Sequence, residues 1–133
     1  MEERIKKELV LQALNIRKNS YSPYSCFCVG AALLTEGGRI YTAVNMENAS
    51  YPAGICAEAA AFAKAISEGE RSFSAIAIAG GKEGEECFPC GICRQIMAEH
   101  CRGDLTVIII RSPEDYRELK LEQLLPFGFR LEK

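Results

Sequence analysis

The 133-residue chain contains no tryptophan, only one histidine and no excess of positive charge. Its formal net charge is -2, whereas a protein that grips a nucleic-acid backbone usually carries a basic excess. Polymeric nucleic acid is therefore disfavoured as a partner, although a small ligand without phosphates is not. No apolar run approaches the ~18 residues that a membrane span needs, so we expect no membrane contact.

Signals of export and a disulfide framework are also missing from the sequence. Residues 1–7 are charged and contain no apolar signal-peptide core. The cysteine count is seven, and an odd number without an export signal argues against a disulfide scaffold. We therefore expect a cytoplasmic protein with reduced thiols, which can serve as metal ligands, nucleophiles or small core residues.

The length and composition fit one globular domain over residues 1–133, because 48% of the residues are hydrophobic and 26% are charged. Hydrophobic periodicity and turn residues predict these elements: helix 2–18, strands 27–34 and 39–44 with a turn at 37–38, helix 56–67, strand 73–79, helix 91–101, strand 105–110 and helix 121–125. Strands that alternate with helices in the second half favour parallel pairing, and the first half supplies an antiparallel hairpin. The sequence thus predicts a mixed sheet covered by helices, followed by a tail.

Three cysteines lie at the starts of two predicted helices. Cys56 opens one helix, and Cys90 and Cys93 begin another, directly after Pro89. Unpaired N–H groups and the positive end of the helix dipole gather there and lower thiol pKa values, and the thiolate is the form that binds zinc. Three protein ligands leave one tetrahedral position open, which is the arrangement of a catalytic zinc site.

Glu58 follows Cys56 by two residues, so its carboxylate is expected to point at the open position. A carboxylate there can take a proton from water and deliver it elsewhere. Zinc deaminases carry a ligand, one intervening residue and a glutamate, followed by Pro-Cys-x-x-Cys. Here that pattern reads Cys56-Ala57-Glu58 and then Pro89-Cys90-Gly91-Ile92-Cys93.

Two other interpretations of these cysteines remain open. A closed structural zinc site could use Cys87 or His100 as a fourth ligand. Cys87 and Cys90 could also form a thioredoxin-like redox pair, although that leaves Cys56 and Cys93 unexplained. The other cysteines, at positions 26, 28 and 101, are expected in the core or on the surface.

Several further motifs appear in a fixed order and resemble the cysteine-ligated, homotetrameric cytidine deaminases over nearly the whole chain. They are Tyr21-Ser22-Pro23-Tyr24-Ser25, Phe27 to Leu33, Asn45 to Tyr51, Pro89 to Gln95, and Glu122 to Pro126. The resemblance implies a three-layer α/β/α sandwich around a five-stranded mixed sheet, one Zn²⁺ per chain and a homotetramer. It also implies hydrolysis of cytidine and deoxycytidine to the uridine forms in pyrimidine salvage, with ammonia released.

The same resemblance assigns roles to individual residues. Asn45 and Glu47 would hydrogen-bond the ribose, and Phe27 would pack against the nucleoside. Glu58 would protonate the ring N3 and then the leaving amine, while the backbone N–H of Ala57 would hold the reactive hydroxyl.

Two aromatic residues would lie where substrate and subunits meet. Tyr51 would contribute at a subunit contact beside the substrate, and Phe129 matches a tail aromatic that reaches into a neighbouring subunit's site. Simpler roles stay open for these positions: a turn for Asn45, a solvated charge for Glu47, and core packing for Phe27 and Tyr51.

Three positions depart from the family pattern and bear on the choice of substrate. Ala59 stands where the family has an arginine, Phe88 replaces a small hydroxyl residue, and the tail stops soon after Phe127-Gly128-Phe129. Arg94 is the remaining candidate to offset the thiolate charge. The alternatives are a deaminase of a cytosine-containing antibiotic of the blasticidin S type and a non-catalytic zinc-binding protein of this fold. The Asn45–Glu47 pair favours a ribose, and Glu58 favours catalysis.

Overall fold

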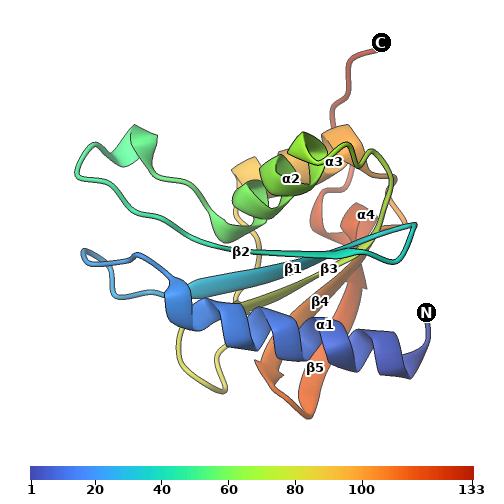
Figure 1. The fold of residues 1–133 in the computed structure, drawn as a ribbon. Helices are drawn as coiled ribbons and strands as arrows, with labels where there is room; N and C mark the ends of the chain where they lie inside the picture. The colour runs from blue at the N-terminus through green and yellow to red at the C-terminus, as the bar shows by residue number, and fades with distance from the viewer.

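A five-stranded sheet runs through the centre of the molecule in the computed structural model, which describes residues 1–133 (Figure 1). In spatial order its strands are β2 (Ile40–Val44), β1 (Val29–Thr35), β3 (Phe73–Gly80), β4 (Thr106–Ser112) and β5 (Asp115–Lys120). β3 and β4 pair in parallel, and the other neighbours pair in antiparallel fashion. The predicted mixed sheet is confirmed, with its parallel pair in the second half of the chain.

Helices cover both faces of this sheet (Figure 1). Helix α1 (Glu3–Ile16) packs on one face through Leu9, Val10 and Ala13. Helices α2 (Ala57–Ser67) and α3 (Gly91–His100) lie on the other face, and the short α4 (Leu121–Leu124) contacts α3. The result is the three-layer α/β/α sandwich that the resemblance implies. None of these helices combines the length and apolar character that crossing a membrane requires.

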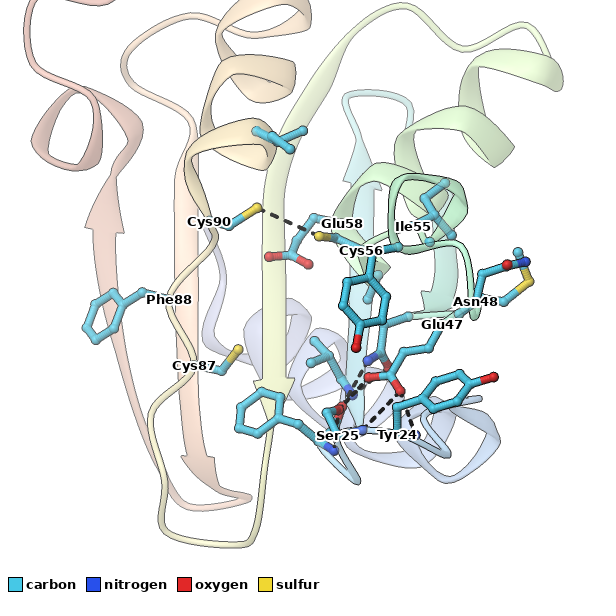
Figure 2. A pocket seen from close by; sticks show the side chains of 18 residues that line it. Tyr24, Ser25, Glu47, Asn48, Ile55, Cys56, Glu58, Cys87, Phe88 and Cys90 are labelled. Atoms are coloured by element: carbon cyan, nitrogen blue, oxygen red, sulfur yellow. Dashed lines mark hydrogen bonds between the residues drawn. The ribbon is translucent and has the colours of Figure 1, made fainter.

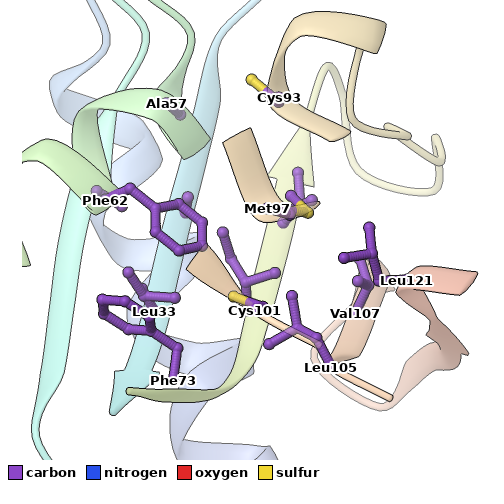
Figure 3. Packing of buried hydrophobic residues seen from close by; sticks show 14 of the residues in the cluster. Leu33, Ala57, Phe62, Phe73, Cys93, Met97, Cys101, Leu105, Val107 and Leu121 are labelled. Carbon is purple, nitrogen blue, oxygen red and sulfur yellow. The ribbon is translucent and has the colours of Figure 1, made fainter. Parts of the chain in front are cut away.

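The larger of the two hydrophobic cores lies between the sheet and helices α2 and α3, and its side chains determine how closely these helices pack on the sheet (Figure 3). Phe62 of α2 is 1% exposed and meets the ring of Phe73 edge-on at 5.1 Å, while Met97 of α3 is fully buried. Small residues on the strands and on α2 let the layers approach closely, as Ala31 and Ala61 do. This packing holds the first turns of both helices in fixed positions.

β5 is the element that the sequence pattern failed to predict. Its six residues carry four charges, and only Tyr116 and Leu119 are partly buried. These two positions are three residues apart, so the alternation of apolar and polar residues that marks a strand is absent. β5 forms because it follows β4 through a tight turn and completes the edge of the sheet, with Thr106 opposite Lys120.

Element boundaries differ from the prediction at two places near the candidate site. The helix predicted for residues 2–18 ends at Ile16 and continues as a 3-10 turn, Arg17–Asn19. The strand predicted from Phe27 begins at Val29, because Cys26 adopts a left-handed conformation with φ 59 that breaks the extended backbone. Phe27 therefore lies in the loop before β1, where its side chain is free to face a ligand.

Candidate active site

The three predicted cysteine ligands meet where helices α2 and α3 begin. Cys56 directly precedes α2, Cys90 directly precedes α3, and Cys93 lies in the first turn of α3. Their sulfur atoms all lie within 4.8 Å of one another, and the Sγ atoms of Cys56 and Cys90 are 3.7 Å apart (Figure 2). Two core-anchored helices thus bring together residues that are 34 positions apart in the chain.

This spacing fits a zinc ion. Zinc in a tetrahedral site lies about 2.3 Å from each thiolate, which places two sulfur ligands about 3.8 Å apart. The separation of Cys56 and Cys90 matches that value, and the backbone N–H groups of Ile92 and Cys93 point at the Cys90 sulfur. The three cysteines provide the soft donors that zinc prefers, and together they could hold one metal ion.

The electrostatics of the cluster also call for a cation. Burial raises the pKa of the Cys56 thiol to about 11, and burial together with the neighbouring Glu58 raises the pKa of Cys93. Burial likewise opposes ionisation of Cys90, but hydrogen bonds from the Cys93 N–H, the thiols of Cys56 and Cys93 and the Ile92 N–H together outweigh it and lower the pKa of Cys90. Three adjacent thiolates repel one another, so a divalent cation is what stabilises them together.

The two alternative interpretations of the cysteines lack the geometry they need. His100 ends α3 and stacks its ring on Phe62, with the centroids 5.9 Å apart. Cys87 lines the neighbouring cavity but does not belong to the group of converging ligand atoms. Neither residue closes a fourth zinc position, and Cys90 faces Cys56 rather than pairing with Cys87.

Glu58 lies in the first turn of α2, beside the cysteine cluster (Figure 2). The residue is only 4% exposed, and burial raises the pKa of its carboxyl group. A buried carboxylate with a raised pKa accepts a proton more readily than a free one and can hand it on, which suits a general acid–base residue. The preceding residue, Ala57, is the first of α2, so its backbone N–H has no carbonyl within the helix to bond.

A cavity of about 790 Å³ opens directly above this group. Eighteen residues line it, and they include most of the predicted site: Phe27, Asn45, Glu47, Tyr51, Cys56, Ala57, Glu58 and Cys90. The lining contains no lysine, arginine or histidine, and its two acidic residues are Glu47 and Glu58. Its volume suits a small molecule, and its lining favours one that is partly apolar and carries no negative charge.

Asn45 directly follows β2 and is held in place by both ends of its side-chain amide. Its Oδ1 accepts hydrogen bonds from Val29 N at 2.9 Å and from Ser20 Oγ, and its Nδ2 donates to Phe27 O at 2.8 Å. A plain turn residue does not need three side-chain bonds. These bonds fix the orientation of the amide, which lines the cavity. They also fix the backbone at Phe27 and Val29, on either side of Cys28.

Glu47 lies in a cradle formed by the loop before β1. Its Oε1 accepts hydrogen bonds from Tyr24 N at 3.0 Å and Ser25 N at 3.1 Å, and its Oε2 accepts one from Ser25 Oγ (Figure 2). The Ser25 hydroxyl holds the pKa of Glu47 below its ordinary value, opposed by partial burial and aided by the two backbone N–H groups. Ser25 also accepts a bond from Phe27 N at 3.0 Å, a linking role that the sequence did not indicate.

Three residues of the predicted site, Cys93, Arg94 and Phe129, lie outside the cavity lining, and so does Ala59. Arg94 donates from Nε to Pro89 O and from Nη1 to Leu124 O, each at 2.7 Å, so its guanidinium braces the residue before Cys90. Phe129 is 64% exposed, and its carbonyl accepts a bond from Gln95 Nε2 at 3.0 Å. Ala59 packs against the core beneath α2. Cys87 and Ile92, in turn, line the cavity without having been predicted to.

Comparison with known proteins agrees with this geometry. Residues 3–109 match the family model described as the cytidine and deoxycytidylate deaminase zinc-binding region. A cytidine deaminase from Sporosarcina psychrophila is 44% identical over 126 residues, which cover 95% of this chain and 92% of that protein.

Solved structures give the same result. A cytidine deaminase from Burkholderia pseudomallei superimposes with a TM-score of 0.87 at 39% identity, covering 97% of this chain and all of that one. The cytidine deaminase from Mycobacterium tuberculosis gives a TM-score of 0.82 at 37% identity, covering 95% of this chain and 98% of that one. With its cysteine cluster, its glutamate and its fold, the chain belongs to the cytidine and deoxycytidylate deaminase family of zinc-dependent enzymes.

Proposed function

We propose that this protein hydrolyses cytidine and deoxycytidine to uridine and deoxyuridine, releasing ammonia. The observation that carries the proposal is the placement of the buried Glu58 between a three-cysteine zinc site and a cavity of nucleoside size. A structural zinc site has no need of a proton-transferring carboxyl group beside it, so the arrangement argues against a non-catalytic zinc-binding protein.

The residues around the cavity divide the chemistry between them. When bound by Cys56, Cys90 and Cys93, zinc supplies a Lewis acid that makes water reactive near neutral pH. Glu58 takes the proton released there and passes it to the ring N3 of the base; it then carries the proton of the added hydroxyl to the amine, which leaves as ammonia. The backbone N–H of Ala57 is free to donate to the oxygen that adds to the ring.

The far end of the cavity offers one donor and one acceptor to a sugar. The Asn45 amide has two protons and donates one to Phe27 O, so the second remains for a ligand. Glu47 accepts three bonds on its two oxygens, which together have room for about four. A ribose hydroxyl can accept from Asn45 and donate to Glu47. This pair favours a nucleoside over an antibiotic of the blasticidin S type.

The charge of the cavity separates a nucleoside from a nucleotide. No basic side chain lines the cavity, while two carboxyl groups do. A phosphate group would enter without a cation to pair with and would be repelled by Glu47, whose lowered pKa keeps it ionised. We therefore propose that the substrate carries a free 5′-hydroxyl group rather than a phosphate.

We further propose a homotetramer in which the tails of neighbouring chains complete each site. Large apolar side chains are exposed at Tyr51 (82%), Phe127 (104%), Phe129 (64%) and Leu131 (72%), and Phe127 holds a left-handed conformation with φ 57. Apolar side chains that are exposed close together, as Phe127, Phe129 and Leu131 are along the tail, suit an interface. Seven free cysteines, three of them zinc ligands, suit a reducing compartment, so we place the enzyme in cytoplasmic pyrimidine salvage.

Absorbance at the cytidine maximum tests the proposed substrate directly. Purified zinc-loaded protein is mixed in parallel with cytidine, deoxycytidine, cytidine 5′-monophosphate and blasticidin S. We expect the absorbance to fall with both nucleosides and to stay constant with the nucleotide and the antibiotic. Turnover of the nucleotide at the rate of cytidine would overturn the charge argument. Turnover of blasticidin S alone would replace the proposed substrate by the alternative.

A further inference from the structure

Residues 86–88 lead into the zinc-binding motif, and their side chains turn alternately toward the edge strand β5 and toward the cavity. Cys87 points toward the cavity, whereas the ring of Phe88 points away from Glu58 (Figure 2). Glu86 lies on the same side as Phe88, since both contact one residue of the edge strand β5. The 86–88 segment is therefore a wall of the cavity in which Cys87 is the inner residue, while Glu86 and Phe88 are the outer ones that turn toward β5; Phe88 still borders the cavity with part of its surface.

Arg117 of β5 contacts both outer residues. Its Nε lies 2.9 Å from Glu86 Oε2, and its Nη2 donates to Glu86 Oε1 at 3.3 Å, so the two groups meet as a fork. The Arg117 Cζ also lies 5.3 Å from the centroid of the Phe88 ring, within the range of a cation–π contact. One planar guanidinium thus holds the residues on either side of Cys87, which a lysine could not do in the same way.

The inner residue fits a notch that only glycine leaves open. A Cβ at Gly80, the last residue of β3, would lie 2.5 Å from both Cβ and Sγ of Cys87 and 3.3 Å from Cε2 of Phe27. Cys87 is therefore packed against the backbone of β3 and beside the aromatic ring that borders the cavity. Any outward movement of the 86–88 segment would withdraw Cys87 from this notch and widen the cavity beside Phe27.

We propose that Arg117 is a positioning residue that keeps the 86–88 segment closed as a wall of the substrate cavity. Its part in substrate binding rests on the proposed nucleoside deaminase function, whereas its effect on the wall itself does not. Arg117 touches neither the zinc ligands nor Glu58, so it acts through Glu86 and Phe88. The unpredicted edge strand β5 thereby contributes to the site, and Phe88, a departure from the family pattern, provides the surface for this contact.

Alkylation of Cys87 measures the closure of the wall without relying on activity. Zinc-loaded wild-type protein and variants are treated with iodoacetamide, and labelling is followed for each cysteine peptide by mass spectrometry. The exposed Cys26 serves as the internal reference. Arg111→Ala is the matched control, because Arg111 lies on the same hairpin and pairs with Asp115 at 3.4 Å, outside the 86–88 segment.

We expect Arg117→Ala to speed the labelling of Cys87 about fivefold relative to Cys26. At 1.4 kcal/mol per factor of ten, a fivefold change corresponds to about 1 kcal/mol. This is the size expected for the loss of an exposed ion pair together with a cation–π contact. Arg117→Lys should fall between wild type and Arg117→Ala, and Arg111→Ala should match wild type. Equal labelling in all four proteins overturns the proposal. An equal increase in both alanine variants also overturns it, because the hairpin as a whole would then be loosened.

Kinetics with cytidine test the second half of the proposal. Because the wall borders the substrate and takes no part in proton transfer, Arg117→Ala should raise KM about fivefold while kcat changes by less than about twofold. A fall in kcat at constant KM would contradict a positioning role in binding. If cytidine is no substrate of any of the proteins, the proposed function fails while the labelling result still decides the role of Arg117.

Discussion

Gly80→Ala should disturb the cavity more than any other single added methyl group at its wall. The new Cβ would lie 2.5 Å from two atoms of Cys87, whereas ordinary carbon contacts are about 3.5–4.0 Å. The Cβ of Cys87 cannot rotate away, so the 86–88 segment has to move outward by about 1 Å. Overpacking of this kind costs about 1–3 kcal/mol, which corresponds to a fall of roughly 4–12 °C in Tm for a chain of this size.

Thermal denaturation and steady-state kinetics check this prediction. Gly37→Ala is the control, because its Cβ would meet only Thr35 Oγ1 at an ordinary 3.8 Å. Gly80→Ala should lower Tm and raise KM for cytidine, and adding Cys87→Gly should recover part of both by removing the two clashing atoms. The reasoning is refuted if Gly80→Ala and Gly37→Ala have the same Tm and KM.

Three shorter predictions concern residues around the site. Ser25→Ala removes the first cause of the lowered pKa of Glu47, so the pKa rises and the carboxylate loses its charge sooner as pH falls. Cytidine binding should then weaken at a higher pH than in wild type, whereas 2′,3′-dideoxycytidine should show no such shift if Glu47 binds the ribose. Arg94→Ala removes the brace on Pro89 O, and zinc should pass to a chelator faster than from wild type; an unchanged release rate would leave Arg94 without influence on the metal. Phe129→Ala should raise KM, and light scattering of wild type should give a tetramer; a fully active monomer would contradict the proposed assembly.

Much of the site was predictable because its ligands depend on local structure. The helix starts at Cys56 and Cys90 follow from an alanine-rich segment and from Pro89-Cys90-Gly91, and helix starts favour thiolates whatever the rest of the fold does. To bring cysteines that are far apart in the sequence together, the fold then needs only two helices that begin side by side on one face of a sheet. The structure confirms this arrangement.

The contacts that support the site depend on tertiary structure and were not predictable in the same way. Ser25 holds Glu47 across 22 residues of sequence, and Arg117 reaches Glu86 across 31. Serine and arginine are common surface residues, and no local pattern distinguishes those that bind a distant carboxylate. β5 was missed for a related reason: an edge strand rich in charge forms through pairing with β4 rather than through its own hydrophobic period.

The left-handed Cys26 shows why the position of Phe27 required the structure. The run from Phe27 to Leu34 is apolar throughout and predicts a strand from its first residue. The turn that wraps around Glu47 forces Cys26 to φ 59, and β1 starts two residues after Phe27. The aromatic ring is thereby turned from the sheet toward the cavity, where it borders the predicted substrate.

Turnover of cytidine by Glu58→Gln at equal zinc content tests the central claim most directly. Glutamine keeps the shape of the buried Glu58 side chain but cannot accept a proton, so the zinc content measured by elemental analysis should stay at one per chain. The loss of cytidine absorbance should slow by at least about 10²–10⁴-fold, which is typical when a general acid–base residue is removed. A zinc-loaded Glu58→Gln protein within about tenfold of wild type would fall outside that range and contradict the account.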